Sequence, residues 1–226
     1  MCGRFTLRTP ASAVARLFAD LELTPPEFKP RYNIAPTQAI SVVRQSPIEG
    51  LHWCQLRWGL IPFWAKDRAI GSQMINARSE TIATKPSFRA AFKSRRCLIP
   101  ADGFYEWKKL GGTKKQPQYI TLKDNRPFCF AGLWESWTDK ATQEVVESCT
   151  IITTDANEFL LPLHDRMPVI LDPHDFQPWL DRDFKDATWL QSKLRPWAND
   201  DMAFYPVDTV VNNARHEQAD CIQELA

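Results

Sequence analysis

The sequence predicts an α+β fold built around antiparallel or mixed sheets, with helices at its flanks. Strand patterns follow one another through the middle of the chain with short turns between them, whereas helical patterns gather towards the two ends. This order differs from a βαβ array, and no Gly-x-Gly-x-x-Gly or Walker loop is present, so we expect no nucleotide cofactor. With 226 residues, no internal repeat and no long linker, residues 1–226 are expected to form a single domain.

The first half of the chain opens with a helix and continues with strands. Thr9 and Pro10 form a typical helix start. The apolar side chains that follow share one helical face: Val14, Leu17, Phe18 and Leu21. The proline-rich stretch 24–37 is expected to be irregular, and residues 59–67 are expected to form a loop. Strand patterns occupy residues 39–44, 51–58 and a short strand end at 74–76.

The second half carries most of the expected strands. A helical stretch ends at Phe92, and the strand patterns after it lie near residues 96–100, 103–109, 117–123, 127–134, 144–153, 169–171 and 203–207. Gly111 and Gly112 predict a hairpin between the second and third of these strands. A helical turn is expected at 155–162, and helices near 173–181 and 186–195.

Cysteine usage and hydropathy exclude several classes of protein. The cysteines at positions 2, 54, 97, 129, 149 and 221 form no Cys-x-x-Cys pair, which argues against a disulfide scaffold, a zinc knuckle and thioredoxin chemistry. The N-terminus lacks the apolar stretch of a signal peptide. No apolar run approaches the ~20 residues that a membrane helix needs. We therefore expect a cytoplasmic, nucleoid-associated protein with no membrane partner.

The net charge of +1 hides a strong asymmetry between the two halves of the chain. Residues 1–130 contain 21 Lys and Arg against 9 Asp and Glu, and residues 131–226 contain 7 against 18. This pattern has two interpretations. Either two faces of one fold attract each other, or the first half presents a cationic surface to a polyanion such as nucleic acid.

Cys2 is the residue that points most directly to chemistry. Initiator methionine is usually removed before a small side chain, which would leave Cys2 with a free α-amine and a free thiol. Such a 1,2-aminothiol condenses with an aldehyde to an imine, and its thiol then closes a five-membered thiazolidine. The unperturbed pKa values, about 7.7–8.0 for the amine and about 8.5 for the thiol, make both groups reactive near neutral pH. The alternative is an incidental small apolar residue near the terminus.

Glu106 lies in the second of three polar clusters, which span residues 76–80, 102–107 and 162–168. Strand alternation puts Phe104 and Glu106 on one face and Tyr105 and Trp107 on the other. A carboxylate on a half-buried strand needs a partner or a raised pKa, and a raised pKa suits a general acid–base near pH 7. The alternative is a surface or salt-bridged Glu106.

The other two clusters supply further candidates with ordinary alternatives. His164 lies in a loop between two prolines, where a catalytic role competes with a structural or exposed one. Asn76 ends a strand, where its amide oxygen could accept a hydrogen bond from an amine or simply cap a turn. Arg78 is a possible phosphate ligand. No His or Cys spacing indicates a metal site, and no Gly-x-Ser-x-Gly indicates a serine hydrolase.

Phe63 and Trp64 form an aromatic pair in the loop 59–67. Such pairs often plug the edge of a core. Alternatively they stack on the bases of a single strand, at roughly 1–3 kcal/mol per stacked base. The cationic first half of the chain makes the nucleic-acid interpretation a serious one.

Taken together, these segments resemble the SRAP family, the SOS-response-associated peptidase or abasic-site processing proteins. The resemblance follows the whole chain in order and rests on MCGRF at the start, RYNIAP at 31–36, INAR at 75–78, CLIPADGFYEW at 97–107, LHDRMP at 163–168 and VNN at 211–213. It implies a single domain with a β-rich core of barrel-like sheets and a positively charged groove for single-stranded DNA. We expect a monomer, and the implied chemistry needs no metal and no organic cofactor.

The resemblance also implies roles for individual residues. Cys2, after loss of Met1, would crosslink to the ring-opened aldehyde of an abasic site. Asn76 would hold the α-amine, Glu106 would act as acid–base, and His164 would assist. The implied DNA contacts are Arg4, Asn33, Phe63, Trp64, Arg78 and Arg166. Phe63 departs from the two tryptophans that relatives often carry at this aromatic wedge.

Three functions from different classes remain to be separated. The leading one is a DNA-lesion crosslinking enzyme that shields abasic sites, with weak abasic-site lyase activity as a side reaction of the imine. The second is a Cys2-dependent peptidase, which would include removal of Met1 by the same site. The third is a non-catalytic single-stranded DNA-binding protein, whose binding would be reversible and salt-dependent.

Overall fold

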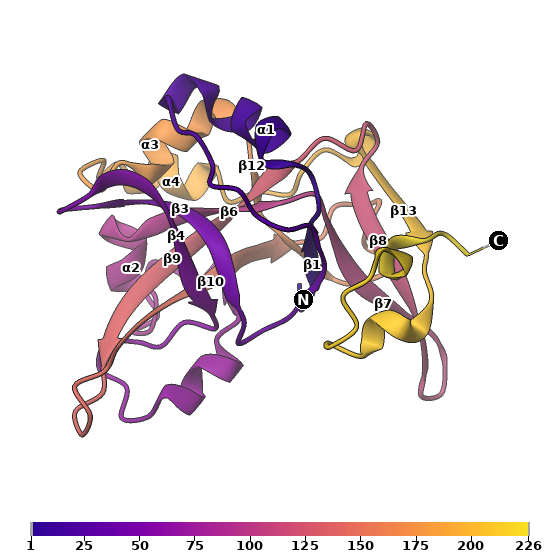
Figure 1. The fold of residues 1–226 in the computed structure, drawn as a ribbon, viewed down its shortest axis with the longest axis horizontal. Coiled ribbons are helices and arrows are strands. Elements are labelled where there is room, and N and C mark those ends of the chain that lie inside the picture. The colour runs from indigo at the N-terminus through magenta and orange to yellow at the C-terminus, as the bar shows by residue number, and fades with distance from the viewer. Residues whose placement is uncertain (1, 226) are drawn as a thin grey trace.

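Five strands close into a barrel in this computed structural model, which describes residues 2–225 (Figure 1). They are β3 (Ala39–Ser46), β4 (Gly50–Trp58), β6 (Arg96–Ala101), β9 (Phe128–Thr138) and β10 (Val145–Asp155). The pairing runs β10–β4–β3–β6–β9 and returns to β10. Only the β10–β4 contact in this ring is parallel, so the sheet is mixed. Three short strands attach to it: β5 (Asn76–Arg78), β11 (Arg166–Pro168) and β12 (Ile170–Leu171).

A second, antiparallel sheet lies beside the barrel (Figure 1). Its strand order is β13 (Met202–Pro206), β8 (Lys114–Leu122), β7 (Gly103–Gly111), β1 (Phe5–Leu7) and β2 (Arg31–Ile34). Within this sheet, β1 joins the two layers, because Phe5 pairs with Phe104 of β7 while its ring packs on the barrel. The Phe5 ring lies 5.2 Å from the ring of Trp58 and 5.8 Å from that of Phe130.

Short helices cover the outside of the strands (Figure 1). The α-helices are α1 (Ala11–Val14), α2 (Arg89–Ser94), α3 (Phe176–Leu180) and α4 (Ala187–Ser192). The 3-10 helices are η1 (Ala15–Leu21), η2 (Arg68–Gln73), η3 (Pro173–Asp175), η4 (Asn199–Asp201), η5 (Thr209–Asn212) and η6 (Ala219–Ile222). None of these helices is long and apolar enough to cross a membrane.

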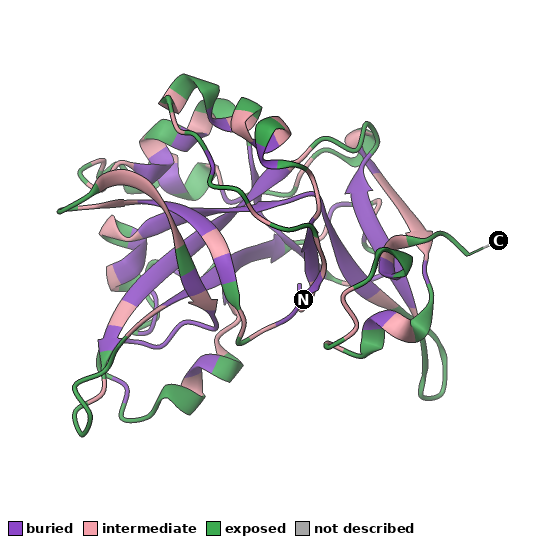
Figure 2. Ribbon diagram, in the orientation of Figure 1, coloured by how far each residue is buried: buried purple, intermediate pink, exposed green. Residues whose placement is uncertain are grey.

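One large apolar cluster runs through the barrel and under β7 and β8, as the buried strands in Figure 2 show. It includes Phe5 and Phe104 from the second sheet and Phe130 from the barrel, so the two sheets share a core. This β-rich, single-domain α+β architecture confirms the fold class predicted from the sequence, barrel-like sheets included.

Several local expectations need correction. Residues 24–37 are not wholly irregular, because Arg31–Ile34 forms β2 against β1 between two flanking prolines. The strands β1 and β11 were not expected, since each has only three residues and shows no period. The expected helix after Thr9 is α-helical only over Ala11–Val14 and continues as the 3-10 helix η1. The stretch before Phe92 is mostly turns, with α2 starting at Arg89.

Candidate active site

The strand β1 carries Cys2 into the interior of the protein. Phe5 pairs with Phe104 and Thr6 with Gly103 of β7, and the Tyr105 N–H donates to the Arg4 carbonyl at 3.0 Å. This antiparallel register brings the chain before Phe5 alongside residues that follow Tyr105. Cys2 is completely buried. Met1, and with it the expected removal of Met1, lies outside the described residues.

Asn76 holds Cys2 by its backbone. Its side-chain amide Nδ2 donates a hydrogen bond to the Cys2 carbonyl at 2.8 Å. Asn76 stands at the start of β5, which pairs in parallel with β10 through Ile151. The amide Oδ1 of Asn76 is buried and accepts no hydrogen bond from any described residue. Asn76 therefore binds residue 2 and keeps an acceptor atom beside it.

Glu106 is 5% exposed in the middle of β7. Phe104 belongs to the large core cluster, whereas Tyr105 packs in a separate aromatic cluster with Trp107 against it, as strand alternation predicts. Burial raises the pKa of Glu106 to about 7, so the surface alternative is wrong and the carboxyl can exchange a proton near neutral pH. The Glu106 carboxylate also acts on the Cys2 thiol. Burial raises the pKa of this thiol well above its usual value, and the negative charge of Glu106 raises it further.

His164 follows a tight turn that leads from β10 into β11. Asn157 fixes this turn, because its Oδ1 accepts from the Leu160 N–H at 2.9 Å. The His164 ring accepts a hydrogen bond at Nδ1 from the Arg166 N–H, at 2.9 Å, which leaves Nε2 to carry the ring proton. Asp165 Oδ1 lies 2.7 Å from the same Nδ1, but this carboxylate is 81% exposed and can turn to water. Burial lowers the pKa of His164, so the ring is neutral at pH 7.

Glu106 and His164 line one open pocket of about 660 Å³. The remaining lining residues come from the β7–β8 hairpin and the turn before β11: Trp107, Lys109, Lys115, Pro162, Leu163 and Asp165. The structure thus brings together all four predicted catalytic residues. Asn76 donates a hydrogen bond to the Cys2 carbonyl, and the charge of Glu106 acts on the Cys2 thiol. His164 lines the same pocket as Glu106.

Arg4 and Asn33 have internal partners instead of a free surface. The Arg4 Nη1 donates to Asn33 Oδ1 at 2.6 Å and to the Val211 carbonyl at 2.7 Å. Asn33 is completely buried, and its Nδ2 donates to the carbonyls of residues 211, 213 and 216. A direct DNA contact by Asn33 does not fit this burial. The two residues instead tie the segment 211–216 to β1 and β2.

The two other predicted DNA-binding arginines differ sharply. Arg166 is 8% exposed and forms ion pairs with Glu80 at 2.8 Å and Asp155 at 2.6 Å, so its charge is largely compensated. Arg78 is exposed at the end of β5, two residues after Asn76. Arg78 therefore remains available to an external anion, whereas Arg166 mainly supports the start of β11 next to His164.

Phe63 and Trp64 project from a hydrogen-bonded turn. They are 60% and 47% exposed, so they do not plug the edge of the core. The turn is closed by a hydrogen bond from the Ala65 N–H to the Pro62 carbonyl at 2.8 Å. Trp137 of β9 anchors it by donating from Nε1 to the Ala65 carbonyl at 2.8 Å. The exposed pair is held in place by buried neighbours on both sides.

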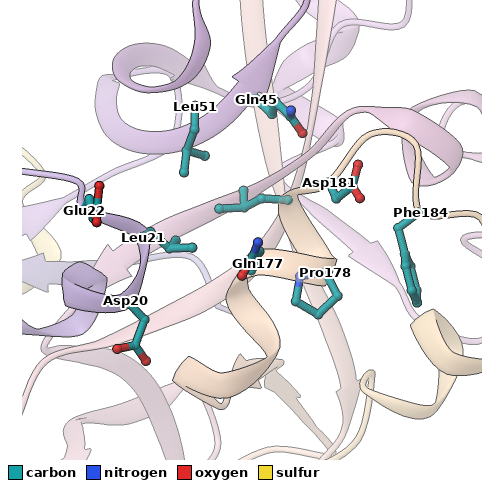
Figure 3. A pocket seen from close by; sticks show the side chains of 10 residues that line it. Asp20, Leu21, Glu22, Gln45, Leu51, Gln177, Pro178, Asp181 and Phe184 are labelled. Carbon is teal, nitrogen blue, oxygen red and sulfur yellow. The ribbon is translucent and has the colours of Figure 1, made fainter.

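A second cavity, of about 650 Å³, contains none of the predicted site residues (Figure 3). It is lined by the apolar side chains of Leu21, Leu51 and Phe184 and by the carboxylates of Asp20, Glu22 and Asp181. The negative charges of these carboxylates would repel a polyanion such as nucleic acid.

Among residues 2–225, one group of side chains could hold a metal ion. His216, Asp220 and Cys221 have donor atoms within 4.8 Å of one another. His216 Nε2 is already 2.7 Å from Asp220 Oδ1, and none of the three lines the pocket of Glu106.

Comparison with known proteins decides the family. The family profile described as SOS response associated peptidase (SRAP) matches residues 1–214. The chain belongs to the SRAP family. It is 45% identical over 225 residues to the abasic site processing protein YoqW of Bacillus subtilis, covering 99% of both chains. It is 32% identical over 231 residues to the abasic site processing protein YedK of Escherichia coli, covering all of both. A crystal structure of a Bacteroides thetaiotaomicron protein superposes with a TM-score of 0.85 at 27% identity, covering all of both chains.

Two features of this SRAP site were missed by sequence reasoning. The internal neutralisation of Arg166 was hidden because Glu80 lies 86 positions away in the chain. The positions of Lys109 and Lys115 in the pocket were also missed. The lysine doublets on either side of Gly111-Gly112, with the expected hairpin pairing, were the signal that could have found them.

Proposed function

We propose that this protein processes abasic sites in DNA by capturing them covalently through Cys2. The observation that carries the proposal is the arrangement around Cys2, where Asn76 holds the backbone and Glu106 lies next to the thiol. The names of the relatives YoqW and YedK support the same lesion as substrate. The partner is proposed to be single-stranded DNA with an abasic site.

The first step opens the lesion and attacks it. An abasic sugar is a cyclic hemiacetal, and opening it to the aldehyde requires proton transfer at the ring oxygen. His164, neutral and protonated on Nε2, is placed on the pocket wall to assist this transfer together with Glu106. The α-amine of Cys2, after loss of Met1, then attacks the aldehyde carbon C1′ and forms a carbinolamine. The Oδ1 of Asn76, which accepts no hydrogen bond from any other described residue, is suited to accept one from this amine.

The second step removes water. Glu106 gives its proton to the carbinolamine hydroxyl, which leaves as water, and the Cys2 nitrogen becomes a protonated imine. A carboxyl with a pKa of about 7 is well suited to this role, because it is still half protonated at neutral pH.

The third step closes the ring. The Cys2 sulfur adds to the imine carbon, and the thiol proton passes to the Glu106 carboxylate, which restores the acid. The product is a thiazolidine, and one water is lost overall. The thiol is intramolecular and therefore has a high effective concentration, so closure outruns hydrolysis of the imine. The capped aldehyde cannot undergo strand scission, and any imine that fails to close would account for weak lyase activity.

DNA binding is proposed to use exposed aromatic and cationic side chains. Phe63 and Trp64 offer a stacking surface, and Arg78 offers a cation on the strand that carries Asn76. Arg4, Asn33 and Arg166 contribute by holding the segments around the site, because each of them forms hydrogen bonds or ion pairs within the protein.

A Cys2-dependent peptidase is the second candidate, and the family description favours it. Its nucleophile would be a thiolate, yet burial raises the pKa of the Cys2 thiol far from neutrality. A peptidase acting on external peptides is therefore disfavoured, whereas intramolecular ring closure needs no free thiolate. Removal of Met1 by the same site remains compatible with this geometry.

The test is crosslinking with protein whose loss of Met1 is verified by mass. Single-stranded DNA with one abasic site is expected to give a denaturant-resistant protein–DNA band. Cys2→Ala and undamaged DNA serve as controls and should give none. An N-terminal extension that keeps Cys2 internal should also abolish the band. Equal bands from wild type and Cys2→Ala would overturn the proposal, and reversible binding alone would favour a non-catalytic DNA-binding protein.

A further inference from the structure

Two lysines that line the pocket face each other across the β7–β8 hairpin. Lys109 of β7 is the registered partner of Lys115 of β8, so their side chains leave the hairpin on the same face. Both are exposed, and both line the pocket that holds Glu106 and His164. Lys109 is also close enough to His164 for its charge to contribute to the lowered pKa of that ring. The hairpin thus brings two cations directly to the candidate reaction centre.

Two of the arginines that were expected to bind DNA have partners within the protein. Arg166 is ion-paired with Glu80 and Asp155, and Arg4 donates to Asn33 and to a backbone carbonyl. Within residues 2–225, by contrast, neither Lys109 nor Lys115 forms an ion pair. The polyanionic strand that enters the pocket therefore meets these two lysines as uncompensated charges.

We propose that Lys109 and Lys115 form a phosphate clamp, which binds the backbone phosphate next to the abasic nucleotide and so seats the sugar between Glu106 and His164. This inference rests on the proposed function. The Asp165 carboxylate lines the same pocket on the side of His164 and is 81% exposed. Its repulsion of phosphate would direct the backbone to the lysine side, so the pocket carries a polarity that orients the strand.

The same hairpin provides a matched control. Lys108 and Lys114 are also exposed, yet neither lines the pocket. Lys108 is registered with Gln116, and strand alternation turns it to the opposite face from Lys109. The double variants Lys109→Gln/Lys115→Gln and Lys108→Gln/Lys114→Gln therefore remove the same charge from the same hairpin. Only the first removes the clamp.

The experiment measures equilibrium binding by fluorescence anisotropy at several salt concentrations. The probe is a single strand with one tetrahydrofuran residue, which mimics the abasic sugar but has no aldehyde and cannot be crosslinked. For single strands, the slope of log affinity against log salt falls by about 0.7 for each lost phosphate contact. Because the clamp binds one phosphate, the clamp variant is expected to lose about 0.7 from the magnitude of this slope, and the control variant close to none. Circular dichroism and thermal melting check that both remain folded.

A second probe locates the phosphate. Neutral methylphosphonates replace the phosphate on the 5′ side or on the 3′ side of the tetrahydrofuran. One of the two is expected to weaken wild-type binding and to remove the difference between wild type and the clamp variant, as coupled groups do in a double-mutant cycle. The other should leave that difference intact.

Two results would overturn the clamp. The first is an equal fall in slope for both double variants, which would make the lysines general surface charge. The second is a difference that neither methylphosphonate removes. Because the probe cannot react, these outcomes are independent of crosslinking. A normal clamp effect in a protein that forms no crosslink with a true abasic site would support the clamp and contradict the proposed chemistry.

Discussion

The side-chain amide of Asn76 donates to the Cys2 carbonyl at 2.8 Å and so fastens residue 2 to the barrel. Asn76 belongs to β5, which is hydrogen-bonded to the barrel strand β10, whereas Cys2 precedes β1 of the second sheet. This single contact therefore links the two sheets at the candidate reaction centre. Its rigidity matters because a near-attack geometry is lost with displacements of about 1 Å.

Asn76→Ala should slow crosslinking by about tenfold or more, which corresponds to about 1.4 kcal/mol in the barrier. The variant loses both the donor to Cys2 and the buried Oδ1 acceptor. Asn76→Asp keeps an acceptor but loses the donor, and should be slowed as well. Single-turnover gel kinetics with an abasic single strand give the rates. Unchanged rates in both variants would remove Asn76 from the site.

Glu106 should give crosslinking a pH dependence centred near neutrality. Burial raises the pKa of this carboxyl to about 7, so the proton it donates is present below pH 7 and is lost above it. The rate of the dehydration step should therefore fall as the pH rises through 7. Glu106→Gln should crosslink much more slowly, and its rate should not show this fall as the pH rises through 7. A wild-type profile without an inflection between pH 6 and 8 would contradict the assignment.

The same shift predicts a change in stability with pH. The folded-state pKa of Glu106 is raised above its unfolded value, so wild type loses stability as the pH rises from about 4.5 towards 7, up to about 3 kcal/mol. Glu106→Gln carries no such penalty. Thermal melting should show the variant more stable than wild type at pH 8, with the difference shrinking towards pH 5. A constant difference across this range would contradict the raised pKa.

Trp64→Ala should weaken non-covalent binding to single-stranded DNA without destabilising the protein. Stacking on one base contributes about 1–3 kcal/mol, and the side chain is 47% exposed, so little folded-state packing is lost. Phe63→Trp should tighten binding, because it enlarges the stacking surface. Ile48→Ala is the matched control, since Ile48 is 94% exposed on the β3–β4 turn. Equal affinities for Trp64→Ala and wild type would rule out stacking.

Asn33→Ala should act on stability more than on DNA. The buried amide satisfies the carbonyls of Val211, Asn213 and His216 and accepts from Arg4, so its removal leaves several buried polar groups without partners. We expect a loss of about 2–4 kcal/mol and a fall in Tm of about 5–10 °C. A weaker DNA affinity at unchanged Tm would restore the expectation of a direct contact.

The elements that the sequence predicts best are those with a clear period. The strands β3, β4, β7 and β9 show alternation or continuous apolar runs, and the alternation of β7 also predicts the burial of Glu106. The short strands β1 and β11 were not predicted, because three residues are too few to show a hydrophobic alternation. Their pairing depends on partners far along the chain.

The candidate site, too, depends on residues that are far apart in the chain. The convergence of Cys2, Asn76 and Glu106 follows from sheet topology, which local patterns do not contain; here the resemblance to the SRAP family supplied what spacing could not. Residue type alone also misleads about charge. Arg166 and Arg78 look equivalent in the sequence, yet Glu80 and Asp155 compensate Arg166 while Arg78 is exposed.

The central claim is that Cys2 traps the aldehyde with both its amine and its thiol, and the intact mass of the adduct tests it most directly. The predicted adduct has the mass of the protein without Met1 plus the DNA minus one water, and it survives denaturation without borohydride. Cys2→Ser should give at most an adduct that needs borohydride reduction to persist. An adduct of wild type that also needs borohydride, or that forms on another residue by peptide mapping, would contradict the account.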